Sequence, residues 1–173
     1  MSALRFLKKS TVSSTVSTVS LTDVFESDFN VHKILFREFT LDSGTATFYV
    51  KLIDLNGTVI SNTDYQQAGT ITRDDTTFTE RRSTGSSNGI LSQYSIDDAT
   101  EEALNGYLYV YNARQSAHTF VTGNFTVRIN GLLQGIKTIG VLKNPGQVSG
   151  IELSLSSNSF DSGEIEIYGM SEL

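Results

Sequence analysis

Apolar and polar side chains alternate along much of the chain, most clearly towards its C-terminal end. Every second residue is apolar in Ile151, Leu153 and Leu155, and Ile165 and Ile167 repeat the pattern. Side chains of a strand point alternately to opposite faces, so each segment has one apolar and one polar face. Such half-buried strands need a second layer to cover their apolar faces, which predicts a layered β structure.

The same alternation predicts further strands over 4–8, 10–21, 31–40, 45–55, 89–96, 106–111, 118–130 and 135–142. Asn56-Gly57 lies between two strand-like runs, a combination typical of a tight hairpin. Residues 31–40 and 106–111 are apolar at both parities, so we expect central strands there, with 31–40 covered on both faces.

Three segments are less regular. Residues 64–88 are expected to contain one or two strands with long loops, and such loops often carry surface interactions. Residues 22–27 could form one helical turn or a loop, and 97–104 is the one plausible helical turn, with acidic residues near its start.

About eight to eleven short strands with almost no helix predict an all-β, single-domain fold, an antiparallel sandwich or a barrel. The length of 173 residues fits one domain. We divide the chain into an N-terminal arm or edge strand, residues 1–9, and a β-sandwich domain, residues 10–173.

Composition excludes several partners. The net charge of −6 argues against a nucleic-acid partner, because phosphate binding needs a basic face. No apolar run approaches the ~20 residues that cross a bilayer, so no membrane partner is expected. There is no cysteine for disulfides or thiolate metal sites. The N-terminal charges follow Leu4, Phe6 and Leu7 instead of preceding an apolar core, which argues against an export signal.

Candidate catalytic and metal-binding groups are few. His32 and His118 are the only histidines, which argues against a catalytic triad and against a zinc site. Asp97-Asp98 with Glu101-Glu102 could gather Ca²⁺ ligands, but the spacing is not that of a known calcium loop, and a solvated acidic face is favoured.

Two further sets allow alternative interpretations. The neighbours Asp74 and Asp75 would point to opposite sides of a strand and cannot flank one glycosidic bond. The rings of Tyr107, Tyr109 and Tyr111 could stack on a sugar or a nucleotide, although a core role is favoured because aromatic residues dominate cores. The residues therefore predict no enzyme, no metal and no cofactor.

Several short motifs follow one another along the chain: Met1–Lys9, Ser13–Leu21, Thr22–Phe25, Ser27–Ile34, Asn56–Ser61 with Tyr65, Arg82–Thr84, Tyr109–Asn112, Ile139–Leu142, Ile151 and Phe160–Gly169. In this order they resemble small virion structural proteins of tailed, often marine, phages. Asn112-Ala113 departs from the Asn-Pro that relatives often have. The resemblance implies a jelly-roll-like module that decorates capsids or forms tail appendages, and it brings no catalytic residues.

The expected function is therefore that of a capsid decoration (knob or cement) protein on the head shell. The alternative is a tail-fibre or receptor-binding module, and the lack of heptad repeats favours decoration. A carbohydrate-active enzyme on the same fold would need paired carboxylates in one cleft. Expected partners are the major capsid protein or tail components, further copies of the chain and host-surface glycans, on a particle assembled in the host cytoplasm.

Two groups of residues are candidates for the interface. The first is the apolar arm residues, which could lie on a neighbouring subunit or form a strand of their own sandwich: Leu4, Phe6 and Leu7. The second is the arginines of the irregular segment, whose loops would face outward: Arg73, Arg81 and Arg82.

Overall fold

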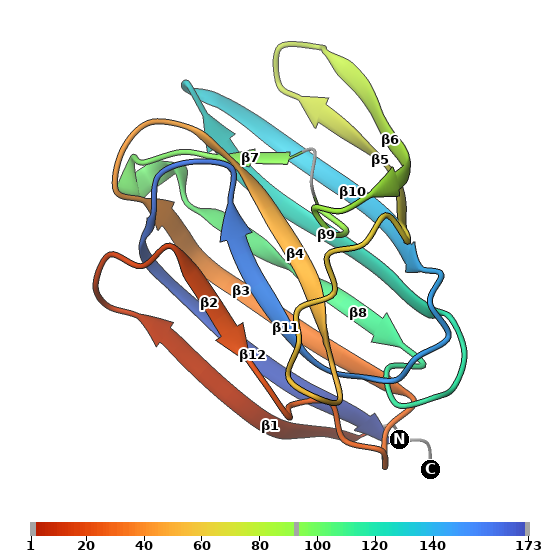
Figure 1. The fold of residues 1–173 in the computed structure, drawn as a ribbon. Coiled ribbons are helices and arrows are strands. Elements are labelled where there is room, and N and C mark those ends of the chain that lie inside the picture. The colour runs from red at the N-terminus through yellow and green to blue at the C-terminus, as the bar shows by residue number, and fades with distance from the viewer. Residues whose placement is uncertain (1–2, 92–93, 172–173) are drawn as a thin grey trace.

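The alternating segments form two antiparallel β-sheets that face each other (Figure 1). The computed structural model describes residues 3–91 and 94–171. The larger sheet has eight strands, in the order β1 (Ala3–Val12), β12 (Phe160–Ser171), β3 (Val31–Leu41), β8 (Leu104–Tyr111), β9 (Thr119–Ile129), β10 (Leu132–Leu142), β5 (Tyr65–Arg73) and β6 (Phe78–Ser86). The smaller sheet has four, in the order β2 (Thr18–Leu21), β11 (Val148–Leu155), β4 (Ala46–Asp54) and β7 (Tyr94–Ile96).

The chain crosses repeatedly between the two sheets. The strands β2, β3, β4 and β5 each lie in the opposite sheet to the strand before them, and so do β7, β8, β11 and β12. The helix in the described residues is one short 3₁₀ turn, η1 (Thr100–Glu102). The predicted all-β, single-domain, jelly-roll-like antiparallel sandwich with little helix is confirmed.

The core lies between the sheets and is rich in aromatic rings. Phe36 packs edge-on against Phe48, with ring centroids 6.0 Å apart, and Phe160 also packs edge-on against Phe48 at 6.0 Å. These rings join the large sheet to β4 of the small one, so they connect the two layers directly. Edge-to-face packing of this kind adds stability beyond the buried area alone.

Most predicted strands are present, but several boundaries differ. The segment 10–21 is divided between the end of β1 and β2, and 22–27 is a loop without a helical turn. Its place is fixed by Val24 and Phe25, whose backbone N–H groups both donate to the carbonyl of Ser149. In the described residues of the segment 89–96, the strand is the short β7. The two closing strands β11 and β12 lie in different sheets and face each other across the core.

The Asn56-Gly57 turn forms, but its second arm is short. Gly57 has a φ of +80°, and its N–H donates to the carbonyl of Asp54. Ile53 and Val59 form a single bridge, and no regular strand continues beyond it. The hairpin prediction therefore holds for the turn and only in part for the pairing.

Residues 64–88 are a regular hairpin, so the prediction of long loops was wrong. β5 and β6 pair in antiparallel register from Tyr65 to Thr72, joined by a turn of a few residues. No residue of β6 is fully buried. The hydrophobic alternation that reveals a strand in a sequence is therefore missing from it.

The strands predicted to be central are central, but one face of each is open. β3 and β8 lie side by side in the middle of the large sheet, yet their outward side chains are only half-buried. The four-stranded sheet covers one face only, which corrects the expectation that 31–40 is covered on both. No helix in the described part of the chain is long and apolar enough to span a bilayer.

Candidate interaction surface

The open face of the eight-stranded sheet, called here the outer face, carries continuous rows of side chains. The strand register aligns one residue from each strand, in the order Phe6, Tyr168, Lys33, Tyr109, Thr122, Ile139, Ala68 and Arg82. A second row beside it contains Leu4, Met170, Val31, Tyr111, Phe120, Val141 and Gln66. Cross-strand neighbours are close enough to form one contiguous surface.

Large apolar side chains on these rows are exposed to solvent. Leu4 is 51% exposed and Phe6 54% at one edge of the sheet, while Phe120 is 48% and Ile139 53% exposed nearer the other. Tyrosine rings fill the space between them. Exposed apolar groups scattered singly are ordinary, whereas a contiguous set marks an interaction site.

Tyrosines and a lysine pack against one another in the middle of the outer face. Tyr107 and Tyr109 pack edge-on at 5.4 Å, and the Lys33 ammonium lies 5.7 Å and 5.8 Å from the centres of these two rings. The Asn124 amide donates to the Tyr107 hydroxyl at 2.7 Å. The tyrosines are half-buried on this face, so the interpretation that favoured a core role was wrong.

An ion-pair network lies beside the aromatic rows. Arg37 pairs with Glu164 at 3.0 Å and with Glu166 at 3.1 Å, and Lys9 also contacts Glu164. The hydrogen bond from Lys9 lowers the pKa of the Glu164 carboxyl. The Tyr168 hydroxyl donates to Glu166 at 2.6 Å, and this bond raises the pKa of the tyrosine.

The charge of the outer face differs from that of the whole chain. Among the described residues, strand register and alternation place on this face the cations Lys9, Lys33, Arg37, Arg82, Arg128 and Lys137 and the carboxylates Glu38, Glu80, Glu164 and Glu166. Cations outnumber carboxylates here, although the chain as a whole carries −6. The surface therefore suits a partner with acidic groups.

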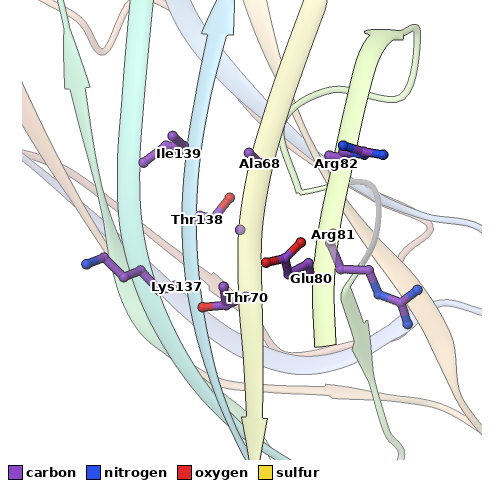
Figure 2. A pocket seen from close by; sticks show the side chains of 9 residues that line it. Ala68, Thr70, Glu80, Arg81, Arg82, Lys137, Thr138 and Ile139 are labelled. Carbon is purple, nitrogen blue, oxygen red and sulfur yellow. The ribbon is translucent and has the colours of Figure 1, made fainter. Parts of the chain in front are cut away.

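Two adjoining hollows lie on the outer face over β10, β5 and β6. One of about 540 Å³ has Phe120, Val141 and Gln66 in its lining. The other, of about 360 Å³, is lined in part by Thr70, Glu80 and Lys137, and Ala68, Arg82 and Ile139 border both (Figure 2).

The predicted interface residues divide into two sites. Leu4 and Phe6 lie on the outer face, and Arg82 ends the same row as Phe6 at the opposite edge. Leu7 is the extra residue of a β-bulge between Phe6 and Lys8, and its half-buried side chain packs against the core. The arm is thus the edge strand β1 of its own sandwich.

Arg73 and Arg81 lie on the other face of the β5–β6 hairpin. Both line a crevice of about 170 Å³ between the hairpin and the small sheet. Figure 2 shows Arg81 extending to the opposite side of β6 from Glu80. The sequence interpretation missed Phe120, Ile139 and Tyr168. A signal was available for Ile139, because 135–142 is apolar at both parities, whereas the other outward residues of β9, beside Phe120, are polar.

The expectation of a solvated acidic face holds for Asp98 and Glu101, which are exposed, and is wrong for the other two carboxylates. Asp97 and Glu102 are buried, and their carboxylates accept from the backbone N–H groups of Asn130 at 3.2 Å and Gly131 at 2.8 Å. Burial alone would raise the pKa of Asp97, but the N–H groups of Asp98 and Asn130 lower it overall. These carboxylates hold the β9–β10 turn.

The histidines do not form a site together. His32 is buried between Phe25 and Phe29, whereas His118 is exposed at the start of β9. Within residues 3–91 and 94–171, no three His, Asp or Glu side chains are grouped closely enough to hold a metal ion.

The chain matches no family model and none of the curated proteins. Among solved structures it is similar to a family 7 alginate lyase, A1-II′, in complex with substrate, at 13% identity and a TM-score of 0.27, over 86% of this chain. A fructofuranosidase from Schwanniomyces occidentalis complexed with fructosylnystose matches at 9% identity and a TM-score of 0.28, over 98% of this chain. The chain spans 65% of the first protein and 34% of the second. Such low TM-scores do not indicate a shared site or a shared function.

Proposed function

We propose that the chain is a structural protein of a phage virion, a non-enzymatic capsid decoration protein that binds the head shell through its outer face. The observation that carries the proposal is the unpartnered set of aromatic and apolar rows on that face. The motifs that resemble virion structural proteins of tailed phages support the same role. The particle surface is then the expected location.

The outer face is large enough for a stable protein contact. Eight strands spaced ~4.8 Å apart carry the two rows and a third row beside them, which runs through Glu166, Tyr107 and Lys137; at ~7 Å per row these give a patch of ~800 Å². Specific interfaces bury about 800 Å² on each partner. The surplus of cations favours an acidic partner surface, and many copies on a symmetric shell would make weak single contacts sufficient.

The first test is the copy number of the chain in purified virions, measured by quantitative mass spectrometry. A head decoration protein is expected on the order of hundreds of copies per particle, as symmetric shells require. Its absence from purified virions would contradict the proposal.

The second test asks whether the outer face makes the contact. Phe120→Asp and Ile139→Asp should each weaken binding to undecorated particles by about tenfold or more, because each places an unpaired charge in an apolar contact. Leu55→Asp is the matched control, since Leu55 is 47% exposed but lies in the turn that follows β4. Equal loss in all three variants would show that the outer face is not the contact.

A second candidate is the tail-fibre or receptor-binding module, and the 540 Å³ hollow favours it. Phe120 offers a ring for stacking on a sugar, and Gln66, Thr84 and Thr122 offer hydrogen-bonding groups around it. A host-surface glycan would be the ligand. About a dozen copies per particle, together with glycan binding that Phe120→Asp removes, would favour this function over decoration.

A further inference from the structure

The crevice under the β5–β6 hairpin is chemically different from the outer face. We call it the arginine crevice, and it is lined by Thr45, Ile71, Arg73, Thr79, Arg81, Ser95, Ile129 and Gln134. Residues of both sheets contribute, since Ser95 belongs to β7 while Arg73 and Arg81 belong to β5 and β6. Its volume of about 170 Å³ equals several water molecules at ~30 Å³ each, enough for a small oxyanion with some of its water.

The polar side chains that line the arginine crevice can all donate hydrogen bonds, and none of them is a carboxylate. Two guanidinium groups are present, accompanied by the hydroxyls of Thr45, Thr79 and Ser95 and by the Gln134 amide. No Asp or Glu is among the lining residues. A guanidinium presents its N–H groups in a planar fork that matches carboxylate and phosphate oxygens.

Arg73 is held in place but not fully satisfied. Its Nη2 donates to the carboxylate of Asp75 at 2.7 Å. Asp75 lies in the β5–β6 turn, so this bond fixes one side of the guanidinium. Its Nε is buried and has no hydrogen-bond partner. A buried donor of a charged group without an acceptor is costly, and native proteins leave few of them.

We propose that the arginine crevice binds a small oxyanion, with Arg73 and Arg81 as its two charged ligands. The oxyanion is either a free ion of the phosphate type or a carboxylate on an acidic peptide segment, which offer the same chemistry to the two forks. This site does not depend on the proposed function, because it lies on the opposite side of the hairpin from the outer face.

The test measures binding of inorganic phosphate by calorimetry at constant ionic strength, with chloride as the reference anion. Arg73→Gln and Arg81→Gln should each raise the phosphate Kd by about tenfold or more, because each removes charge-assisted hydrogen bonds. Arg82→Gln is the matched control, since it removes the same charge one residue away on the other face of β6. Its Kd should stay within about twofold of the parent value.

Asp75→Asn should change the phosphate Kd in the opposite direction to the arginine substitutions. Asp75 competes for Arg73, so its neutralisation should tighten phosphate binding, while the amide oxygen can still accept from the Thr77 N–H as the carboxylate does. Phosphate binding no stronger than chloride, or equal weakening in Arg82→Gln and Arg81→Gln, would overturn the proposal. A hexaglutamate peptide in the same assay distinguishes the sources, since tighter binding of the peptide than of phosphate identifies a carboxylate ligand.

Discussion

His32 is a buried histidine whose ring is packed between aromatic side chains. Its ring lies 4.9 Å from Phe25 and 6.0 Å from Phe29, and its Nε2 accepts from the Glu26 N–H at 3.1 Å. The neutral ring then carries its proton on Nδ1, which is buried and has no partner. Burial, helped by the charge of Arg114, lowers the pKa of His32 to about 4.

This shift predicts a pH-dependent stability. Between pH 6.5 and about 4 the unfolded chain takes up a proton at His32 that the folded chain refuses, so stability falls as the pH falls. The loss should reach about 3 kcal/mol by pH 4 and then level off. Urea unfolding of the parent and of His32→Gln at several pH values measures it as the difference in slope.

His118→Gln is the control, because His118 is exposed. It should keep the pH dependence of the parent protein, whereas His32→Gln should flatten it. The same slope in all three proteins would contradict the assignment to His32.

Tyr65 connects three segments through its hydroxyl. The group accepts from the Leu52 N–H at 2.9 Å and donates to the Ile60 carbonyl at 3.1 Å, in the core. Tyr65→Phe leaves both backbone groups without this partner and should lower the free energy of unfolding by about 1–3 kcal/mol. Denaturant unfolding measures the change. Tyr111→Phe, on the half-exposed outer face, should stay within about 0.5 kcal/mol of the parent.

At the scale of elements, β6 and β9 should differ most in stability. β6 is an edge strand without a fully buried residue, whereas β9 has neighbours on both sides and buries every second side chain. Hydrogen exchange of backbone amides should therefore be more than about tenfold faster in β6 than in β9. Mass spectrometry of the isolated protein measures it, and equal protection of the two strands would contradict this prediction.

Elements with a buried face were predictable, and the others were not. Ala46, Phe48, Val50 and Leu52 alternate because β4 packs one face on the core, and all four are buried in the predicted strand. In β6, residues such as Glu80 have no core to face, so nothing in its sequence distinguishes a strand from a loop. Alternation also gives the face of a strand but not its sheet, so nothing in the sequence shows that β11 and β12 lie in different sheets.

The candidate surface was predictable only at its edges. Leu4 and Phe6 stand out in the sequence because they belong to a short apolar segment beside the basic residues Lys8 and Lys9. Ile139 lies in a strand that is apolar at both parities, a pattern that fits a strand covered on both sides equally well, and Phe120 is the one apolar residue on the outward face of β9. Only the three-dimensional arrangement, in which the four-stranded sheet covers the inner face alone, shows that the other face has no cover.

In the whole molecule, the residues that stabilise the fold and the residues that could contact a partner lie on different faces of the large sheet. The core between the sheets holds the fold, so Phe48→Ala should lower the free energy of unfolding by about 3–5 kcal/mol. Phe120→Thr and Ile139→Thr remove exposed apolar groups and keep a β-favouring residue, so each should change it by no more than about 0.5 kcal/mol.

Combining the two threonine substitutions makes the separation measurable. The double variant should match the parent in urea unfolding, while sedimentation velocity at high concentration should show less self-association, because the largest exposed apolar surface has been reduced. Leu55→Thr, outside the outer face, should leave sedimentation unchanged. A double variant as destabilised as Phe48→Ala would mean that the outer face serves the fold itself, and the apolar rows would then need no partner to account for them.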